Sequence, residues 1–245
     1  MPHEFPYPPV VVNIPEFRLR ALNPSNLAEL EMKVVVGGAY RHQTPIFSAG
    51  MKEVIFRPYW NVPRSILVAE LLPKVRADRS YLARNDYEVV TTQERVVSRG
   101  EVDDHVLELL SAGKLQVRQV PGLKNVLGGV KFIFPNEHSI FLHDTPSQEL
   151  FGADERTFSS GCIRVEHALQ FAAVLLEGQD DWNAGKIQEV VDGAKTETVF
   201  LKTPLPVLIV YWTVSVGASG DLHYARDVYN LDGAVLRALN GSTGP

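Results

Sequence analysis

The first sixty residues carry short apolar runs and alternating apolar and polar positions, which is the pattern of β-strands. Residues 10–14 form an apolar run, and residues 17–20 alternate as a half-buried strand does. Strand-like segments follow at 31–36 and 52–56, with Gly, Pro and Asn between them. Short strands spaced by about 8–12 residues and separated by such turn residues favour a β-sandwich or a β-barrel.

The same pattern returns after residue 120, now with helices between the strands. The spacing of apolar residues predicts amphipathic helices over 166–176 and 182–191. A turn rich in Gly and Ser at 217–221 predicts a hairpin. The strands predicted in this half of the chain cover residues 130–134, 139–143, 196–202, 207–216 and 222–228. The fold class is therefore α+β and mainly β.

Residues 64–120 interrupt the β pattern. Residues 65–76 have helical apolar spacing that breaks at Pro73, and residues 102–110 predict a short helix capped by Asp103 or Asp104. The block is rich in Arg, Asp and Glu. Because it has too few apolar residues to fold alone, we interpret it as an inserted lobe without a core of its own.

The N-terminal residues 1–9 are rich in proline and predict the end of a linker. They lack the charged segment followed by an apolar segment that defines a signal peptide. We therefore expect a fragment of a longer protein, with further domains upstream. No apolar stretch approaches the roughly 20 residues that a membrane-spanning helix needs.

Composition and charge exclude several classes of function. With 45% hydrophobic residues, 22% charged residues and a net charge of −5, the 245-residue chain is ordinary for a soluble globular protein. No run of Lys and Arg marks a surface for nucleic acid or membrane. The sequence also lacks metal-ligand spacings and a phosphate-binding glycine loop. We expect no metal, no cofactor and no nucleic-acid partner.

The candidate chemistry centres on Cys162, the single cysteine of the chain, and on His143. A thiolate is the reactive form of cysteine, and an imidazole can take the thiol proton and hold an ion pair with the thiolate. Gly161 lets the backbone approach closely, so the N–H groups of Gly161 and Cys162 are candidates for binding an oxyanion. The helix predicted just after Cys162 would add a favourable dipole.

Taken singly, each of these residues has a plainer interpretation. A lone cysteine is more often a small buried apolar residue than a nucleophile. A histidine at the end of a strand is more often held by loop hydrogen bonds, and Ser-Ser-Gly-Cys before a helix is more often a turn. The two together, in this order, favour a catalytic pair.

The segment that contains both residues resembles the signature of L,D-transpeptidases with a YkuD-type domain. That signature is a histidine, a spacer, then Ser/Thr-His-Gly-Cys and an Arg or Asn shortly afterwards, and here the spacer covers residues 144–158. Ser160 stands where most members have histidine, which matches the YcbB-like branch and its Ser-Ser-Gly-Cys motif. The resemblance extends over nearly the whole chain, through residues 11–15, 36–48 and 56–63.

The resemblance implies a β-sandwich with the cysteine and the histidine at one edge. Residues 10–245 would form the catalytic domain, with 64–120 as an inserted capping subdomain. The donor would be a peptidoglycan tetrapeptide stem, whose diaminopimelate carbonyl is attacked by the cysteine with release of D-alanine. The acyl group would pass to the amine of a second diaminopimelate. Carbapenems would be inhibitors, and the location would be the periplasm or cell envelope.

The resemblance also implies roles for individual residues. His143 would be the base that activates Cys162, and the main-chain carbonyl of Asp144 would be the third member of the triad, with its side chain not required.

Around that triad the resemblance implies a substrate cleft. Arg164 would support the site or a substrate carboxylate, with a structural salt bridge as the alternative. Ser160 would bring a hydroxyl group near the thiol. Tyr59 and Trp60 would line the donor cleft, with core packing as the alternative.

The other histidines are expected to lie outside the site. His138 precedes His143 by five residues, which on one strand places it on the opposite face. His42 is expected in a loop, and His105 and His167 on helix surfaces.

Two other functions remain open. A hydrolase would use the same site with water as the final acceptor, acting as an L,D-carboxypeptidase or cleaving a cross-link or a lipoprotein attachment. An inactive peptidoglycan-binding module would keep the fold with an unreactive Cys162. Formation of a cross-linked product would distinguish a transpeptidase from a hydrolase. A carbapenem adduct on Cys162 would distinguish an enzyme from an inactive binding module.

Overall fold

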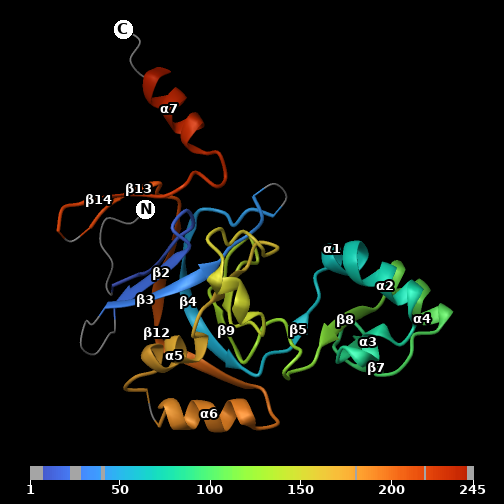
Figure 1. The fold of residues 1–245 in the computed structure, drawn as a ribbon. Coiled ribbons are helices and arrows are strands. Elements are labelled where there is room, and N and C mark those ends of the chain that lie inside the picture. The colour runs from blue at the N-terminus through green and yellow to red at the C-terminus, as the bar shows by residue number, and fades with distance from the viewer. Residues whose placement is uncertain (1–7, 23–28, 40–41, 180, 218, 242–245) are drawn as a thin grey trace.

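A computed structural model describes residues 8–22, 29–39, 42–179, 181–217 and 219–241. Its main body is a closed barrel of eight strands in the order β1-β12-β4-β9-β10-β11-β3-β2 (Figure 1). The strands are β1 Val10–Asn13, β2 Arg18–Leu22, β3 Glu29–Val35, β4 Phe47–Phe56, β9 Val130–Ile133, β10 Leu142–His143, β11 Ile163–Val165 and β12 Glu197–Val210. The mainly β character and the α+β class predicted from the sequence are confirmed.

The strand pairing closes the sheet, so the sandwich implied by the resemblance is wrong and the barrel alternative is correct. Two pairs are parallel, β1 with β12 and β10 with β11, and the other neighbours are antiparallel. β12 is 14 residues long and pairs with both β4 and β1. Its length lets one strand join the two ends of the sheet, which removes the open edges of a sandwich.

The barrel interior is filled by side chains from alternate strand positions, as the two-residue period requires. Phe56, Phe132 and Leu142 are completely buried there. Helix α5, Ala168–Leu175, packs Phe171 against Phe132 with ring centroids 4.9 Å apart. Each such buried ring stabilises the fold by about 1.5–3 kcal/mol.

A second helix, α6 at Ala184–Asp192, covers the barrel below α5 (Figure 1). Just before it, the ring of Trp182 stacks on that of Phe56 at 5.0 Å. Both helices were predicted, and their observed ends differ from the predicted ones by one or two residues.

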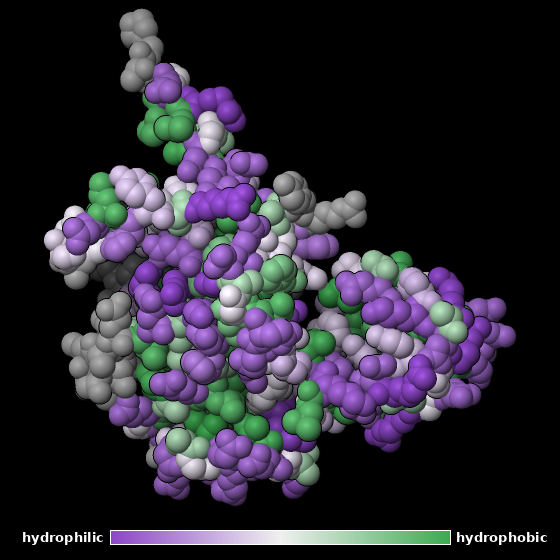
Figure 2. Space-filling model, in the orientation of Figure 1, coloured by the Kyte–Doolittle hydropathy of each residue, from purple (hydrophilic) through white to green (hydrophobic). Residues whose placement is uncertain are grey.

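The inserted lobe lies to one side of the barrel (Figure 1) and has its own sheet in the order β5-β8-β6-β7. We use the name lobe for residues 60–119. Most of the surface that it shows in Figure 2 is hydrophilic. Its elements are β5 Trp60–Asn61, α1 Arg64–Ile66, η1 Leu67–Leu71, α2 Leu72–Ala77, α3 Tyr81–Arg84, β6 Tyr87–Val90, β7 Val96–Ser98, α4 Asp104–Ser111 and β8 Gln116–Gln119.

The lobe contains a hydrophobic cluster that is separate from the barrel core, so the expectation that it lacks a core is wrong. Leu72, Val75 and Leu110 are buried in this cluster. The apolar residues are spread over several short elements, which is why no single segment of the sequence indicated a core.

The helical segment at 65–76 continues through Pro73 because it changes its winding. Residues Leu67–Leu71 form a π-helical turn, η1, immediately before α2. Proline cannot donate the helical hydrogen bond, and its ring crowds the carbonyl four residues earlier. A wider π turn accommodates that crowding without ending the helix. At α4, Asp103 is the residue that caps the helix, accepting a 2.7 Å hydrogen bond from the amide of Val106.

In the C-terminal part the predicted hairpin is present, whereas the ends of the strands and the last helix differ from the prediction. β12 ends at Val210, and a separate hairpin follows, β13 Val214–Val216 with β14 Leu222–Tyr224. Helix α7, Asp232–Gly241, was not predicted and projects away from the barrel (Figure 1). The remaining element is the 3₁₀ turn η2, Gln148–Gly152. No helix in the described part of the chain has both the length and the apolar character that crossing a membrane requires.

Candidate active site

Cys162 and His143 are brought together by the parallel pairing of β10 with β11. Leu142 pairs with Ile163, and both side chains are buried in the barrel. His143 pairs with Arg164. Since successive side chains on a strand point to opposite faces, His143 and Arg164 face away from the barrel core. Cys162 lies immediately before that strand, packs partly against the barrel core, and lines the same pocket as His143 and Arg164.

This face forms one wall of a pocket of about 400 Å³, and the lobe forms the opposite wall. Of the predicted site residues, Cys162, His143, Ser160, Arg164 and Trp60 line the pocket. The lobe contributes Trp60, Asn61, Pro63, Ser65, Ile66 and Glu70.

Tyr59 is not among the lining residues of this pocket. Its ring lies 4.2 Å from the guanidinium carbon of Arg118. Trp60 lines the pocket and also packs against the hydrophobic cluster of the lobe, so both alternatives describe Trp60.

The ring of His143 is fixed by the residue that follows it. Its Nδ1 atom lies 2.5 Å from the main-chain oxygen of Asp144, to which the Nδ1–H donates. That contact leaves the Nε2 lone pair free to accept a proton. Burial lowers the pKa of His143 to about 3, against the opposing effect of the Asp144 hydrogen bond, and the charges of Arg164 and Lys131 lower it further. The imidazole is therefore neutral at neutral pH.

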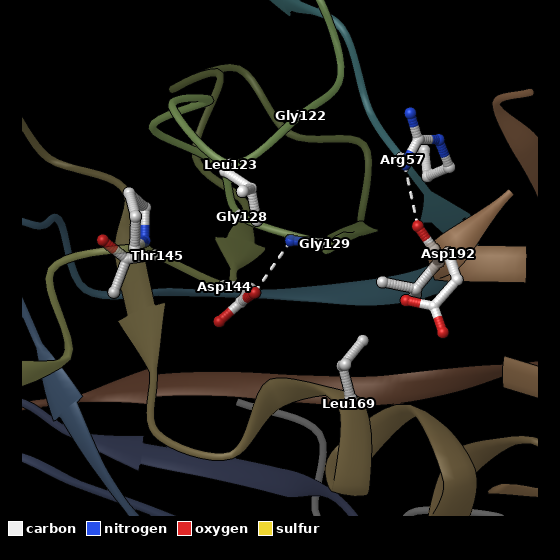
Figure 3. Close-up of a pocket in the computed structure, with 11 residues that line it drawn as sticks. Arg57, Gly122, Leu123, Gly128, Gly129, Asp144, Thr145, Leu169 and Asp192 are labelled. Carbon is white, nitrogen blue, oxygen red and sulfur yellow. Dashed lines mark hydrogen bonds between the residues drawn. The ribbon is translucent and has the colours of Figure 1, made fainter. Parts of the chain in front are cut away.

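The Asp144 side chain holds its own backbone in place (Figure 3). Its carboxylate accepts a 2.8 Å hydrogen bond from the amide of Gly129, and its amide donates to Val130 at 2.9 Å. Burial raises the pKa of this carboxyl group, with the hydrogen bonds acting in the opposite direction. Gly128 has φ +61°, and a Cβ there would lie 2.2 Å from the carboxylate. The position of the Asp144 carbonyl, which orients His143, thus depends on Gly128, Gly129 and the Asp144 side chain.

The Cys162 thiol is half-buried and lies 3.8 Å from the main-chain oxygen of Ser139. Burial raises the pKa of this thiol, while a backbone hydrogen bond from Phe141 and the charge of Lys131 lower it. With the pKa of His143 lowered and that of Cys162 raised, the resting pair is a neutral imidazole and a neutral thiol. The ion pair expected from the sequence is therefore not favoured in this structure.

The loop before Cys162 does not present Gly161 as an oxyanion donor. The amide of Gly161 donates to the Ser159 hydroxyl at 3.0 Å, and that hydroxyl donates to the carbonyl of Cys162 at 2.5 Å. Gly161 has φ +116°, so glycine is needed for the turn itself. In the described part of the chain the amide of Cys162 has no hydrogen-bond partner, which leaves it as the available donor of the pair.

The helix predicted at 166–176 is present as α5, but it begins too far from Cys162 to act on the thiol through its dipole. β11 follows at Ile163–Val165, and α5 begins only at Ala168. A helix dipole acts over about one turn, so it does not reach the thiol. His167 is exposed, as expected, and is the N-cap residue of that helix, with φ 53°.

Four charged or titratable residues near the site were missed. His42, which was expected in a loop outside the site, lines the pocket. Lys131 on β9 pairs with His143 on β10. In the sequence it could have been noticed as a single charged residue within an apolar run. His138 lines the pocket because the chain before β10 is a loop, so strand alternation does not apply to it. Glu70 enters the pocket from the lobe. Among the described residues, no group of three or more His, Cys, Asp or Glu side chains is placed to hold a metal ion.

Comparison with known proteins agrees with this geometry. A barrel with a thiol and an imidazole on one face of adjoining strands is an arrangement suited to acyl transfer. Residues 9–200 match the model of the YkuD family, the L,D-transpeptidase catalytic domain, and the chain belongs to that family. The members of this family are enzymes that act on the cell wall.

One curated relative extends the likeness beyond the matched domain. It comes from Haemophilus influenzae, carries the description "Putative L,D-transpeptidase", and is 32% identical over 223 residues. The match covers 91% of this chain and 44% of the relative, so the chain spans less than half the length of that protein.

Proposed function

We propose that this chain is a peptidoglycan L,D-transpeptidase domain, with Cys162 as nucleophile and His143 as base. The observation that carries the proposal is the β10–β11 register, which puts both side chains on one wall of a pocket while Nδ1 of His143 is held by Asp144. Membership of the family supports the substrate class, the stem peptides of peptidoglycan.

In the first half-reaction Cys162 is acylated. The Sγ proton passes to Nε2 of His143 as the sulfur attacks the carbonyl at the L-centre of diaminopimelate in a tetrapeptide stem. The amide of Cys162 stabilises the developing oxyanion. The bond to D-alanine then breaks, His143 returns the proton to the leaving amine, and a thioester remains.

In the second half-reaction the thioester is transferred. The amine of a second diaminopimelate, having lost one proton to water, attacks the thioester carbonyl and gives a further proton to His143. The C–S bond breaks, and the thiolate takes that proton back. The products are a direct bond between two diaminopimelate residues and the free thiol.

The neutral resting pair implies that proton transfer accompanies the attack. Because the pKa of His143 is low and that of Cys162 is raised, little thiolate exists before substrate binds. Lys131 supports the thiolate as it forms, since its charge lowers the pKa of Cys162.

We also propose the surrounding assignments. Residues 10–245 form the catalytic domain and 64–120 a capping subdomain that closes the donor cleft, with Ser160, Arg164 and Trp60 binding substrate. Carbapenems acylate Cys162, and the protein works in the periplasm as part of a longer chain.

Incubation with purified disaccharide-tetrapeptide tests the function. Mass spectrometry should show a cross-linked dimer and free D-alanine, neither of which forms with Cys162→Ala. Disaccharide-tripeptide as the sole product would identify a hydrolase. An intact-mass measurement with a carbapenem should show one adduct per chain, and its absence together with no D-alanine release would favour an inactive binding module.

A further inference from the structure

Two unpaired charges of opposite sign line the pocket beside Cys162. Arg164 belongs to the barrel wall and Glu70 to the lobe wall. Over the residues that the structure describes, the guanidinium of Arg164 and the carboxylate of Glu70 take part in no hydrogen bond and no ion pair. Burial lowers the pKa of Arg164, and the charge of Glu149 acts in the opposite direction.

Two other partly buried arginines in the described part of the chain are paired, unlike Arg164. Arg118 contacts the Glu88 carboxylate at 2.8 Å, and Arg156 donates three hydrogen bonds to main-chain oxygens. In Arg164 the Nε–H is buried without any partner. A buried unpaired donor on a charged group is costly, and a bound carboxylate would compensate through charge-assisted hydrogen bonds.

Glu70 is directed to the pocket by the π turn. Within η1, Leu67 and Leu71 are buried in the lobe core, whereas Glu70 is exposed and lines the pocket. Its charge contributes, after burial, to raising the pKa of Tyr87 to about 12. The Tyr87 ring lies 6.2 Å from that of Trp60, another pocket residue. Local π windings are frequently found at functional sites.

We propose that Glu70 and Arg164 together bind an α-amino carboxylate group, the ammonium on Glu70 and the carboxylate on Arg164. This assignment rests on the proposed function, since the free D-centre of diaminopimelate is such a group. The apolar pocket residues Ile66, Leu127 and Phe141 suit the methylene chain that leads to it. Both stems carry this group, so the same chemistry can come from the donor or from the acceptor.

We use the name clamp for the pair Glu70 and Arg164. Binding of ligand to a catalytically inactive protein tests the clamp without catalysis. Calorimetric titration of Cys162→Ala protein with disaccharide-tetrapeptide should give an affinity that falls about tenfold when Glu70→Gln is added. Glu108→Gln, an exposed lobe residue outside the pocket, is the matched control and should change nothing. A ligand acetylated on the D-centre amine should bind the Glu70→Gln protein and its parent equally.

The same design applies to the other charge. Arg164→Gln in the Cys162→Ala background should lower the affinity for the ligand with a free carboxylate about tenfold. It should leave the affinity for a ligand amidated at that carboxylate unchanged. Equal affinity of parent and variants for the unmodified ligand, with thermal melts showing intact protein, would overturn the clamp.

Active protein then identifies the source of the group. If the donor is held, Glu70→Gln slows D-alanine release; if the acceptor is held, D-alanine release is unchanged and only dimer formation falls. Either result supports the clamp, and unchanged rates of both steps contradict it. A protein that releases no D-alanine at all refutes the proposed function, while the binding titrations still judge the clamp separately.

Discussion

The Nδ1 atom of His143 lies 2.5 Å from the main-chain oxygen of Asp144, the next residue in the chain. A backbone carbonyl carries no net charge, so it orients the imidazole without stabilising an imidazolium as a carboxylate would. This explains how the ring can be well ordered and yet keep a pKa near 3.

The first prediction concerns thiol reactivity against pH. Because burial raises the pKa of Cys162, the thiolate should appear only above the usual thiol pKa of about 8.5. Alkylation by iodoacetamide should therefore rise steadily through pH 7–9. Rates measured by intact mass that are already constant between pH 5 and 7 would indicate a resting ion pair and contradict the neutral pair.

The second prediction concerns stability at low pH. The unfolded state binds a proton on His143 below about pH 6.5, whereas the folded state does not until about pH 3. Folding is thus progressively disfavoured as pH falls between these values, by about 1.4 kcal/mol per pH unit. When the free energy of unfolding is measured by urea titration at several pH values, His143→Asn should remove this contribution to its pH dependence.

The exposed His105 provides the matched control for this measurement. His105→Asn should leave the pH dependence of the free energy of unfolding as it is. Parallel curves for His143→Asn and the unmodified protein would mean that His143 is protonated in the folded state.

The third prediction concerns Gly128. Alanine there meets both a left-handed φ of +61° and a contact of 2.2 Å with the Asp144 carboxylate. We expect a loss of about 1–3 kcal/mol in stability and slower carbapenem acylation, because Asp144 and hence His143 must move. Gly152→Ala, where a Cβ meets nothing within 4 Å, should preserve both. Normal acylation by Gly128→Ala would show that the Asp144 side chain does not position the histidine.

The fourth prediction concerns the base itself. His143→Ala should lower the rate of carbapenem acylation by at least about 100-fold, the usual contribution of general base catalysis. Circular dichroism should show the same fold. His105→Ala serves as the control with unchanged rate, and near-normal acylation by His143→Ala would remove this residue from the mechanism.

Local patterns predicted the barrel strands, the helical segments at 65–76, 102–110, 166–176 and 182–191, and the cysteine–histidine candidate, since these depend on residues close together in sequence. The closed barrel was not predictable in this way. Pairing of β1 with β12 depends on contacts between distant segments, which no local period reports.

Other misses have equally specific causes. The direction of the Gly161 amide depends on the Ser159 side chain, which accepts its hydrogen bond. The approach of Glu70 to Arg164 depends on how the lobe packs beside the barrel. Residues 1–7, for which a linker was predicted, lie outside the described residues.

The pairing of Val10 with Val207 also has a consequence for the order in which we expect the chain to fold. Loop closure over such a separation is entropically costly, and the barrel cannot be completed until β12 has been synthesised. The lobe cluster involves only residues between Val62 and Val117, so its contacts become available while much of the barrel is still missing. We therefore expect that during synthesis the wall that carries Glu70 forms before the wall that carries Cys162.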